Sequence, residues 1–318
     1  MSILPVSRSV VCAGAVLLSM GPEAVSGDLM IFHAGSLSVP IKEVAEAFRR
    51  EHPSVRILCE AAGSRECARK LTDLGRACDV LVSADYAVID NMLMPDHADW
   101  SIKFAGNEMV IAYTDESALA GKITRDNWHE VLLRKDVMYG RSDPNSDPCG
   151  YRTIFTAQLA ARHYGVPGLA ERIMEKDRRF IRPKETDLLA LLETGAIDYL
   201  FIYRSVAEQH DLRWLSLPDE INLKRPEFAA HYRSVSVEIS GNAPGAFVTQ
   251  YGEPMIYGVT IPKNAPNPRA AIAFVTFLLE RDKGLAILER NGQPGVVPSP
   301  SASYDRIPEA LKRFAVKP

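Results

Sequence analysis

The sequence predicts an α/β fold of two lobes, each a mainly parallel sheet flanked by helices, with two crossing strands between the lobes. Three observations lead to this prediction. In the first hundred residues, apolar runs of strand length alternate with amphipathic helical segments, and this alternation is typical of parallel sheets covered by helices. A second series of the same kind follows residue 113. The chain has 318 residues, which is long enough for two domains of about 150 residues each.

The first lobe is predicted from three units of strand and helix. Strands are expected at Leu29–Phe32, Ser54–Leu58 and Asp79–Val82. The helix after the first strand has an apolar face at helical spacing, made of Leu37, Ile41, Val44 and Phe48. A second helix is expected at Arg65–Leu74, with Ser64 as its N-cap. Asp85 is expected to cap the helix that follows the third strand.

The second lobe is expected to begin after the apolar strand Met109–Tyr113, where polar residues follow. Its predicted helices are Asn127–Leu133, Pro148–His163, Gly168–Glu175 and Glu185–Leu192, and its predicted strands are Val137–Tyr139, Ile197–Tyr203 and Ser234–Ile239. A strand at Met255–Ile261 is expected to return the chain to the first lobe, which helices at Ala270–Leu279 and Gly284–Arg290 complete. The expected division is residues 27–112 and 262–318 for the first lobe and 113–261 for the second.

The first 26 residues have the pattern of a cleaved secretory signal peptide. A short polar start closes with Arg8, an apolar run spans Val10–Met20, and small residues stand at Ala24 and Ser26. The apolar run is too short to span a bilayer comfortably, and we expect cleavage after Ser26. A buried N-terminal helix is the alternative. A signal peptide predicts a periplasmic or otherwise extracytoplasmic protein.

Charge and cysteine spacing exclude several classes of function. The formal net charge is -3 and no stretch is strongly basic, so we expect no nucleic acid partner, and an anion site must be local. Four cysteines follow the signal peptide, namely Cys59, Cys67, Cys78 and Cys149. Their spacing fits no zinc site and no Cys-x-x-Cys redox pair. Because an exported protein can oxidise its cysteines, one disulfide among the first three stays open.

The tripeptide Ala-Gly-Ser follows two of the predicted strands, as Ala34–Ser36 and as Ala62–Ser64. A strand that turns into a helix in this way leaves free backbone N–H groups at the helix start. These groups, the helix dipole and a serine hydroxyl together bind anions. Because ligands bind at the carboxyl ends of parallel strands, both turns are expected to face one small oxyanion. Simple helix capping by the two serines is the alternative.

Two helix starts of the second lobe offer further N–H donors, and each carries a carboxylate. Asp147 fits an N-cap before Pro148, and Glu185 follows Pro183 in a first helical turn. The alternative for both acids is helix stabilisation alone, which contributes roughly 0.3–2 kcal/mol. Tyr203 ends an apolar strand, and its position by itself predicts core packing.

Taken together, these residues resemble the periplasmic molybdate/tungstate-binding proteins of ABC importers, most closely the archaeal-type branch. The matching segments are Phe32–Leu37, Glu60–Ser64, Asp79–Leu81, Ala84–Tyr86, Asp147–Arg152, Asp198–Tyr199, Phe201–Tyr203 and Ile256–Ala265. They span nearly all of the chain after the signal peptide, in the family's order. The resemblance implies a type II periplasmic binding protein fold, no catalytic residue, no cofactor apart from the oxyanion ligand, and a membrane permease as partner. We expect a monomer.

The resemblance also implies roles for single residues. Ser36 and Ser64 match serines that hold the oxyanion through hydroxyl and backbone N–H groups. The N–H groups of Cys149 and Glu185 match backbone donors from the second lobe. Tyr203 matches a tyrosine whose hydroxyl donates to an oxo group. These five residues would surround the anion with donors.

In the archaeal-type branch two carboxylates also bind the metal and raise it from four to six ligands, and Asp147 and Glu185 fall at those positions. Otherwise they would repel a dianion by roughly 4 kcal/mol each, at about 4 Å and an effective dielectric constant near 20. Bonds to Mo(VI) or W(VI) remove the difficulty, because these centres accept oxygen ligands, whereas the sulfur of sulfate and the phosphorus of phosphate do not readily become six-coordinate. Inward-facing carboxylates therefore predict selectivity for metal oxyanions, without ranking tungstate against molybdate.

Three other functions are compatible with parts of the sequence. A receptor of the same fold could bind sulfate, thiosulfate or phosphate. An enzyme could use Cys149 as a nucleophile of lowered pKa at a helix start. However, His163 lies about four turns away on the same helix, at ~1.5 Å per residue, and no other histidine motif offers a base. A ligand-sensing regulatory domain would need a DNA-binding segment, where this chain has the signal peptide pattern. We therefore expect a receptor and not an enzyme.

Overall fold

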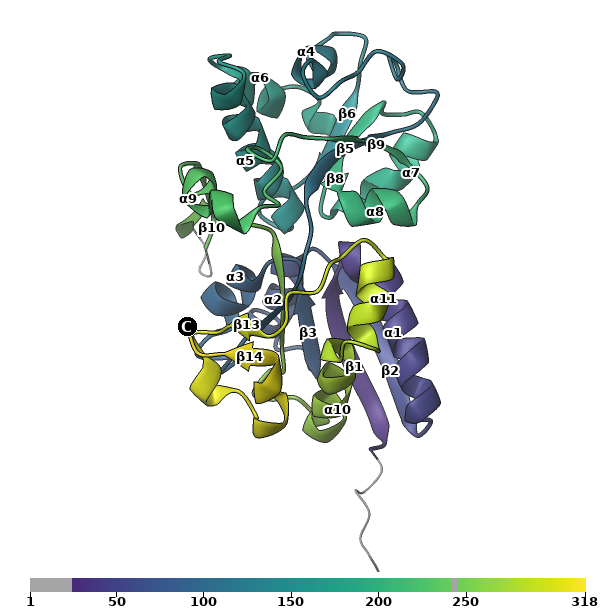
Figure 1. The fold of residues 1–318 in the computed structure, drawn as a ribbon, viewed down its shortest axis with the longest axis vertical. Coiled ribbons are helices and arrows are strands. Elements are labelled where there is room, and N and C mark those ends of the chain that lie inside the picture. The colour runs from purple at the N-terminus through teal and green to yellow at the C-terminus, as the bar shows by residue number, and fades with distance from the viewer. Residues whose placement is uncertain (1–24, 242–244) are drawn as a thin grey trace, which may run out of the picture.

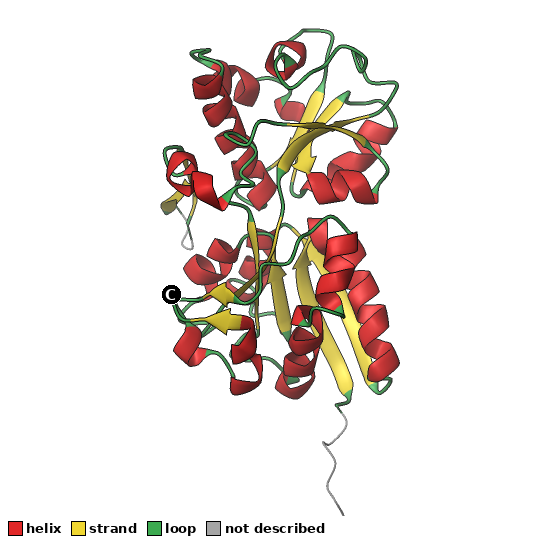
Figure 2. Ribbon diagram, viewed as in Figure 1, coloured by secondary structure: helices red, strands yellow, loops and turns green. Residues whose placement is uncertain are grey.

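The computed structural model describes residues 25–241 and 245–318, which form two lobes (Figure 1). The expected signal peptide lies outside the described residues, except for Val25 and Ser26. Helices cover the central sheet of each lobe, and extended segments pass between the lobes (Figure 2). Within the described residues, no helix has the length and apolar character needed to cross a membrane. The two-lobed α/β fold is confirmed.

The sheet of the first lobe has the strand order β2-β1-β3-β12-β4. Its strands are β1 Gly27–Ala34, β2 Val55–Ala62, β3 Val80–Ser83, β4 Ile102–Gly106 and β12 Ile256–Thr260. β1 is parallel to β2 and β3, whereas β12 is antiparallel to both β3 and β4, so β12 alone runs against the others. In the β1–β2 register Ala34 pairs with Ala62. The two Ala-Gly-Ser turns therefore leave the sheet side by side.

Helices of the first lobe follow the apolar periodicity of the sequence. They are α1 Ser38–Glu51, α2 Ser64–Thr72, α3 Tyr86–Val88, α10 Pro268–Leu279 and α11 Gly284–Arg290. Shorter elements are the 3-10 turns Gly35–Leu37, Tyr304–Arg306 and Glu309–Phe314, the π-turn Ile89–Leu93, and the strands β13 Ser299–Pro300 and β14 Ala315–Val316. The apolar face predicted for α1 is fully buried. Pro40 lies in its first turn, where a missing N–H costs little.

The second sheet repeats this plan in the order β7-β6-β8-β5-β9. Its strands are β5 Met109–Tyr113, β6 Tyr139–Ser142, β7 Ile181–Arg182, β8 Tyr199–Tyr203 and β9 Arg213–Ser216, and β5 alone runs against the others. The helices of this lobe are α4 Trp128–Leu132, α5 Pro148–His163, α6 Leu169–Glu175, α7 Leu189–Glu193, α8 Arg204–Gln209 and α9 Ala229–Tyr232. Its 3-10 turns are Arg178–Phe180, Glu185–Leu188 and Pro226–Phe228. The strands β10 Ser236–Ser240 and β11 Phe247–Tyr251 form a separate hairpin.

The strand pairings show that the chain crosses between the lobes at other positions than expected. All of β5 pairs in the second sheet and all of β12 pairs in the first. The chain therefore changes sheets at Asn107 and Glu108, before the expected boundary at residue 112, and returns before Ile256, not after residue 261. We propose lobe boundaries at these two positions. In each sheet, the one reversed strand is the strand that the chain enters directly after a crossing.

Several local predictions were wrong by a few residues. The strand expected at Val137–Tyr139 lies at Tyr139–Ser142. The prediction ended too early because Arg141 and Ser142 are polar, yet both are buried in the sheet. The helix expected from Glu185 begins as a 3-10 turn and continues as α7. Strands β4, β7, β9, β11, β13 and β14 were not predicted.

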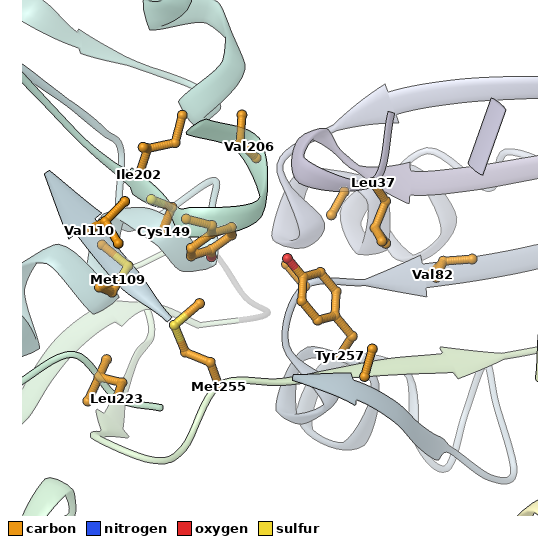
Figure 3. Packing of buried hydrophobic residues seen from close by; sticks show 14 of the residues in the cluster. Leu37, Val82, Met109, Val110, Cys149, Ile202, Val206, Leu223, Met255 and Tyr257 are labelled. Carbon is orange, nitrogen blue, oxygen red and sulfur yellow. The ribbon is translucent and has the colours of Figure 1, made fainter. Parts of the chain in front are cut away.

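Buried apolar side chains of the described residues form two clusters, and the larger one includes residues of both lobes. Figure 3 shows part of it, with Leu37 and Val82 on one side and Met109, Val110 and Ile202 on the other. All four described cysteines are free thiols, so the disulfide left open by the sequence does not form in this structure. The lobes thus share an apolar interior around their crossing strands.

Candidate functional site

Four helix starts, two from each lobe, meet at one buried point. A Cβ atom added to Gly63 would lie 2.3 Å from the carbonyl oxygen of Ser146, and one added to Gly35 would lie 3.2 Å from each carboxyl oxygen of Glu185. The N–H group of Glu66 also donates to the Ser146 carbonyl across the lobes, at 3.3 Å. The turns predicted to bind an anion in the first lobe therefore face the predicted helix starts of the second.

All six candidate residues are at most 1% exposed, namely Ser36, Ser64, Asp147, Cys149, Glu185 and Tyr203. The two serines do not cap helices. Ser36 lies inside the 3-10 turn after β1, and Ser64 is the first residue of α2, and neither element has a side-chain cap bond. For both serines the capping interpretation is wrong.

Each serine hydroxyl instead accepts a hydrogen bond from a neighbour. The hydroxyl of Tyr257 donates to Ser36 Oγ at 3.2 Å, and the backbone N–H of Ala84 donates to Ser64 Oγ at 2.9 Å. Tyr257 lies on β12, and its hydroxyl points toward the second lobe (Figure 3). Each serine oxygen thus accepts a bond, and each hydroxyl also carries one proton that it can donate.

Tyr203, at the end of β8, is arranged in the same way. Its hydroxyl oxygen accepts a hydrogen bond from Nη1 of Arg152 at 3.0 Å. Burial raises the pKa of Tyr203 well above its ordinary value, although the Arg152 charge acts in the opposite direction. Tyr203 is therefore a neutral hydroxyl that carries a proton for donation.

Asp147 is a helix cap, as one interpretation of the sequence predicted. Its Oδ1 accepts from the N–H of Cys149 at 3.2 Å, and its Oδ2 accepts from the N–H of Glu185 at 3.1 Å. These are the two N–H groups that the resemblance assigns to the oxyanion. In this structure both N–H groups donate to the Asp147 carboxylate. This carboxylate therefore lies where the resemblance places the oxyanion.

Glu185 has no such role at its helix start. Lys184 holds the cap position of the 3-10 turn, without a side-chain bond. Both carboxyl oxygens of Glu185 are buried, and among the described residues neither accepts a hydrogen bond from an N–H or hydroxyl group, so their polar neighbour is the Asp147 carboxyl. A buried polar group without a partner costs about 1–3 kcal/mol, and more when it is charged. The ionised form of Glu185 is therefore stable here only with an occupant that bonds to its oxygens.

Burial raises the pKa of both acids. Burial, and after it the Asp147 charge, raises the pKa of Glu185 well above its ordinary 4.5. Burial also raises the pKa of Asp147, but hydrogen bonds, first that with the Glu185 carboxyl and then those from the N–H groups of Cys149 and Glu185, act in the opposite direction. We therefore expect Asp147 to be the charged member and Glu185 to hold the proton when the lobes close without ligand.

The stability of the ligand-free protein is expected to depend on pH through this pair. A pKa raised by folding gives stability that is present below the unfolded value and lost as pH rises through the folded value. Above pH 4.5, the ordinary value for Glu185, the free energy of unfolding should therefore fall, by at most about 1.4 kcal/mol per pH unit. Thermal unfolding between pH 5 and pH 8 measures this loss. Glu185→Gln should flatten the curve, and an unchanged slope would contradict the assignment.

Two residues of the site were missed by sequence reasoning. Arg152 and Tyr257 entered the sequence analysis only as members of segments that match the family. In the structure they donate hydrogen bonds to the hydroxyl oxygens of Tyr203 and Ser36. A signal for Arg152 was present, because α5 contains no acidic residue that could pair with it. No comparable pattern marks Tyr257. Within the described residues, no group of three or more His, Cys, Asp or Glu side chains could hold a metal ion.

Comparison with known proteins decides the family. The model of the bacterial extracellular solute-binding protein family matches residues 29–293. The chain belongs to this family. Its members bind solutes outside the cytoplasm and are not enzymes, so the prediction of a receptor and not an enzyme is confirmed. The ligand of such a protein is cargo and not a cofactor.

Two relatives illustrate the similarity. An uncharacterized solute-binding protein of Petrotoga mobilis is 48% identical over 296 residues, which cover 93% of this chain and 92% of the relative. The molybdate/tungstate-binding protein WtpA of Pyrococcus abyssi is 41% identical over 311 residues, with 89% and 88% covered. The resemblance to molybdate/tungstate-binding proteins noted from the sequence is thus confirmed.

Solved structures of the family's wider fold are more distant. The periplasmic molybdate-binding protein of Azotobacter vinelandii superimposes with a TM-score of 0.61 at 15% identity, covering 85% of this chain and 99% of the other. The sulfate-binding protein SubI of Mycobacterium tuberculosis gives 0.62 at 13% identity, covering 91% and 92%. At such identities these matches show the two-lobed fold and do not distinguish between ligands.

Proposed function

We propose that this protein is an extracytoplasmic receptor that captures tungstate or molybdate between its lobes and delivers the anion to the permease of an ABC importer. The relative from Pyrococcus abyssi, named for molybdate and tungstate binding, supports this choice of ligand. A signal peptide cleaved after Ser26 would export the chain, and one copy would serve as the receptor.

The carboxylate of Glu185 is the observation that carries the proposal. It is buried and lies beside the Asp147 carboxylate, and no N–H or hydroxyl group of the described residues donates to either of its oxygens. A fully ionised sulfate offers such a group only repulsion. Tungsten or molybdenum in the +6 state offers an electrophilic centre to which carboxylate oxygens bond. We therefore assign Asp147 and Glu185 as ligands of the metal in the bound oxyanion.

Hydroxyl donors from both lobes complete the proposed site. Ser36, Ser64 and Tyr203 each accept a bond from elsewhere, and each hydroxyl carries one further proton to donate to the anion. Three donors suit the oxo groups of an unprotonated oxyanion. On binding, the N–H groups of Cys149 and Glu185 would also donate to oxo groups of the anion and no longer to Asp147. Asp147 would then exchange two hydrogen bonds for one bond to the metal.

Hydrogenphosphate is the serious competitor. Its own proton could be donated to one carboxylate, which sulfate cannot do. Because phosphate carries only one proton in most molecules at pH 8, it satisfies both carboxyl groups only where Glu185 keeps a proton of its own. The site is therefore expected to bind phosphate more weakly than tungstate, by an amount that grows as pH rises.

Titration calorimetry of the ligand-free protein tests the proposal at pH 8, with tungstate, molybdate, sulfate and phosphate each added alone. We expect the two metal oxyanions to bind at least about 1,000-fold more tightly than the other two, a difference of about 4 kcal/mol. Sulfate or phosphate binding within tenfold of tungstate would refute the assignment of the carboxylates as metal ligands.

A further inference from the structure

Arg152 connects the two lobes at the edge of the candidate site. It lies in the first half of α5, in the second lobe, and is 3% exposed. Its Nη1 donates to the carbonyl oxygen of Ala84 at 2.8 Å and to the hydroxyl of Tyr203 at 3.0 Å. Ala84 follows β3 in the first lobe. One guanidinium nitrogen therefore joins a backbone group of one lobe to a proposed ligand of the other.

The same guanidinium forms an ion pair with the first lobe. Nη2 of Arg152 lies 3.4 Å from Oδ2 of Asp85. Among the ion pairs of described residues, this is the one in which both side chains are less than 10% exposed. Asp85 is itself fixed, because it caps α3 through the Ala87 N–H and accepts from the Tyr151 hydroxyl at 2.5 Å. The partner of Arg152 is thus rigidly placed.

Ala84 links this contact to a second proposed ligand. Its carbonyl oxygen accepts from Arg152, and its N–H group donates to Ser64 Oγ. The network therefore runs from Ser64 in the first lobe through Ala84 and Arg152 to Tyr203 in the second. Separation of the lobes would break it at the bonds between Arg152 and both Ala84 and Asp85.

The chemistry of arginine fixes the direction of the Tyr203 proton. A guanidinium carries only donors and stays charged at physiological pH. The tyrosine oxygen must therefore accept from Arg152, and its single proton must point elsewhere. When the lobes are apart, Arg152 loses its first-lobe partners and is no longer held in place.

We propose that Arg152 is a positioning residue, through which closure of the lobes turns the Tyr203 hydroxyl into a donor for the bound oxyanion. The proposal rests on the proposed function only in that an oxyanion occupies the site, and it does not depend on which one. It implies that Arg152 slows release of the anion by acting through Tyr203, beyond its contribution to folding.

A double-mutant cycle on the dissociation rate tests this coupling. The variants are Arg152→Met, Tyr203→Phe and both together, with release of bound tungstate followed by stopped flow after dilution or chase. Arg152→Met and Tyr203→Phe should each speed release about 10- to 100-fold. The double variant should release tungstate at least about fivefold more slowly than the product of the two single effects predicts, because part of the Arg152 effect acts through Tyr203. The part that remains in the Tyr203→Phe background reports the lost bonds to Ala84 and Asp85.

Multiplicative effects of the two substitutions, or an unchanged release rate in Arg152→Met, would overturn the proposal. The matched control is Arg162→Met, which makes the same change at an exposed position of the same helix, and should leave release unchanged. Thermal unfolding without ligand reports any structural loss separately. If Arg152→Met does not fold, Arg152→Lys replaces it in the cycle, because it keeps the charge opposite Asp85 but loses the planar fork.

Failure of the proposed function would give a different result. If the wild-type protein binds sulfate or phosphate and not tungstate, the ligand assignment is wrong. The cycle is then measured with that anion, and a multiplicative result would still refute the role of Arg152.

Discussion

Glu185→Gln should reduce tungstate affinity by at least about 1,000-fold, which corresponds to about 4 kcal/mol, without lowering the stability of the ligand-free protein at pH 8. The amide is a far weaker metal ligand than a carboxylate. It also removes a buried ionisable group whose pKa is raised by burial, so the folded protein loses an electrostatic penalty. Calorimetry measures the first effect, and thermal unfolding measures the second.

Asp187→Asn is the matched control, because Asp187 lies in the same 3-10 turn but is exposed and pairs with Lys184 at 3.4 Å. Its tungstate affinity should change less than threefold. A variant of Glu185 that loses stability in proportion to affinity would mean that this carboxylate supports the turn and does not bind the anion.

Gly63→Ala should weaken binding by at least about 100-fold, equivalent to about 2.7 kcal/mol, and leave the fold intact. The added Cβ would lie 2.3 Å from the Ser146 carbonyl oxygen and 2.9 Å from its carbon. These are backbone atoms of the opposite lobe and cannot rotate away. The clash is relieved when the lobes separate, so its cost falls on closure and not on folding.

Small-angle scattering with saturating tungstate checks this second expectation. The wild-type protein should contract on binding, whereas Gly63→Ala should keep the dimensions of the ligand-free state. Gly121→Ala serves as the control, because nothing lies within 4 Å of its Cβ position. Normal contraction and affinity in Gly63→Ala would show that the lobes do not need to approach as closely as they do in this structure.

Apolar periodicity allowed most of the fold to be predicted, and it failed where burial is not visible in local sequence. The predicted bounds of α5 and α11 are those observed. The short strand β9 is half exposed, and β11 is largely exposed, so neither has a continuous apolar run. The positions at which the chain crosses between the lobes were predicted wrongly, because the sequence of a strand does not indicate which sheet the strand joins. Met109–Tyr113 is as apolar as any strand of the first lobe.

The candidate site was predictable where a helix start coincides with a polar residue, as at Ser64 and Asp147. Tyr203 entered through the resemblance, since its apolar strand predicts only packing. The supporting residues were harder to find because their partners lie far away in sequence. Arg152 contacts Ala84 across 68 positions, and Tyr257 contacts Ser36 across 221. No local pattern reports contacts of that range.

The strand order also determines when each lobe can be completed during synthesis. The five strands of the second sheet all lie between Met109 and Ser216. In the first sheet, β4 pairs with β12 and not with β3, so it stays unpaired until Ile256–Thr260 has left the ribosome. Contacts of such long sequence separation are costly to form early. The lobe that begins first along the chain is therefore the last to be assembled.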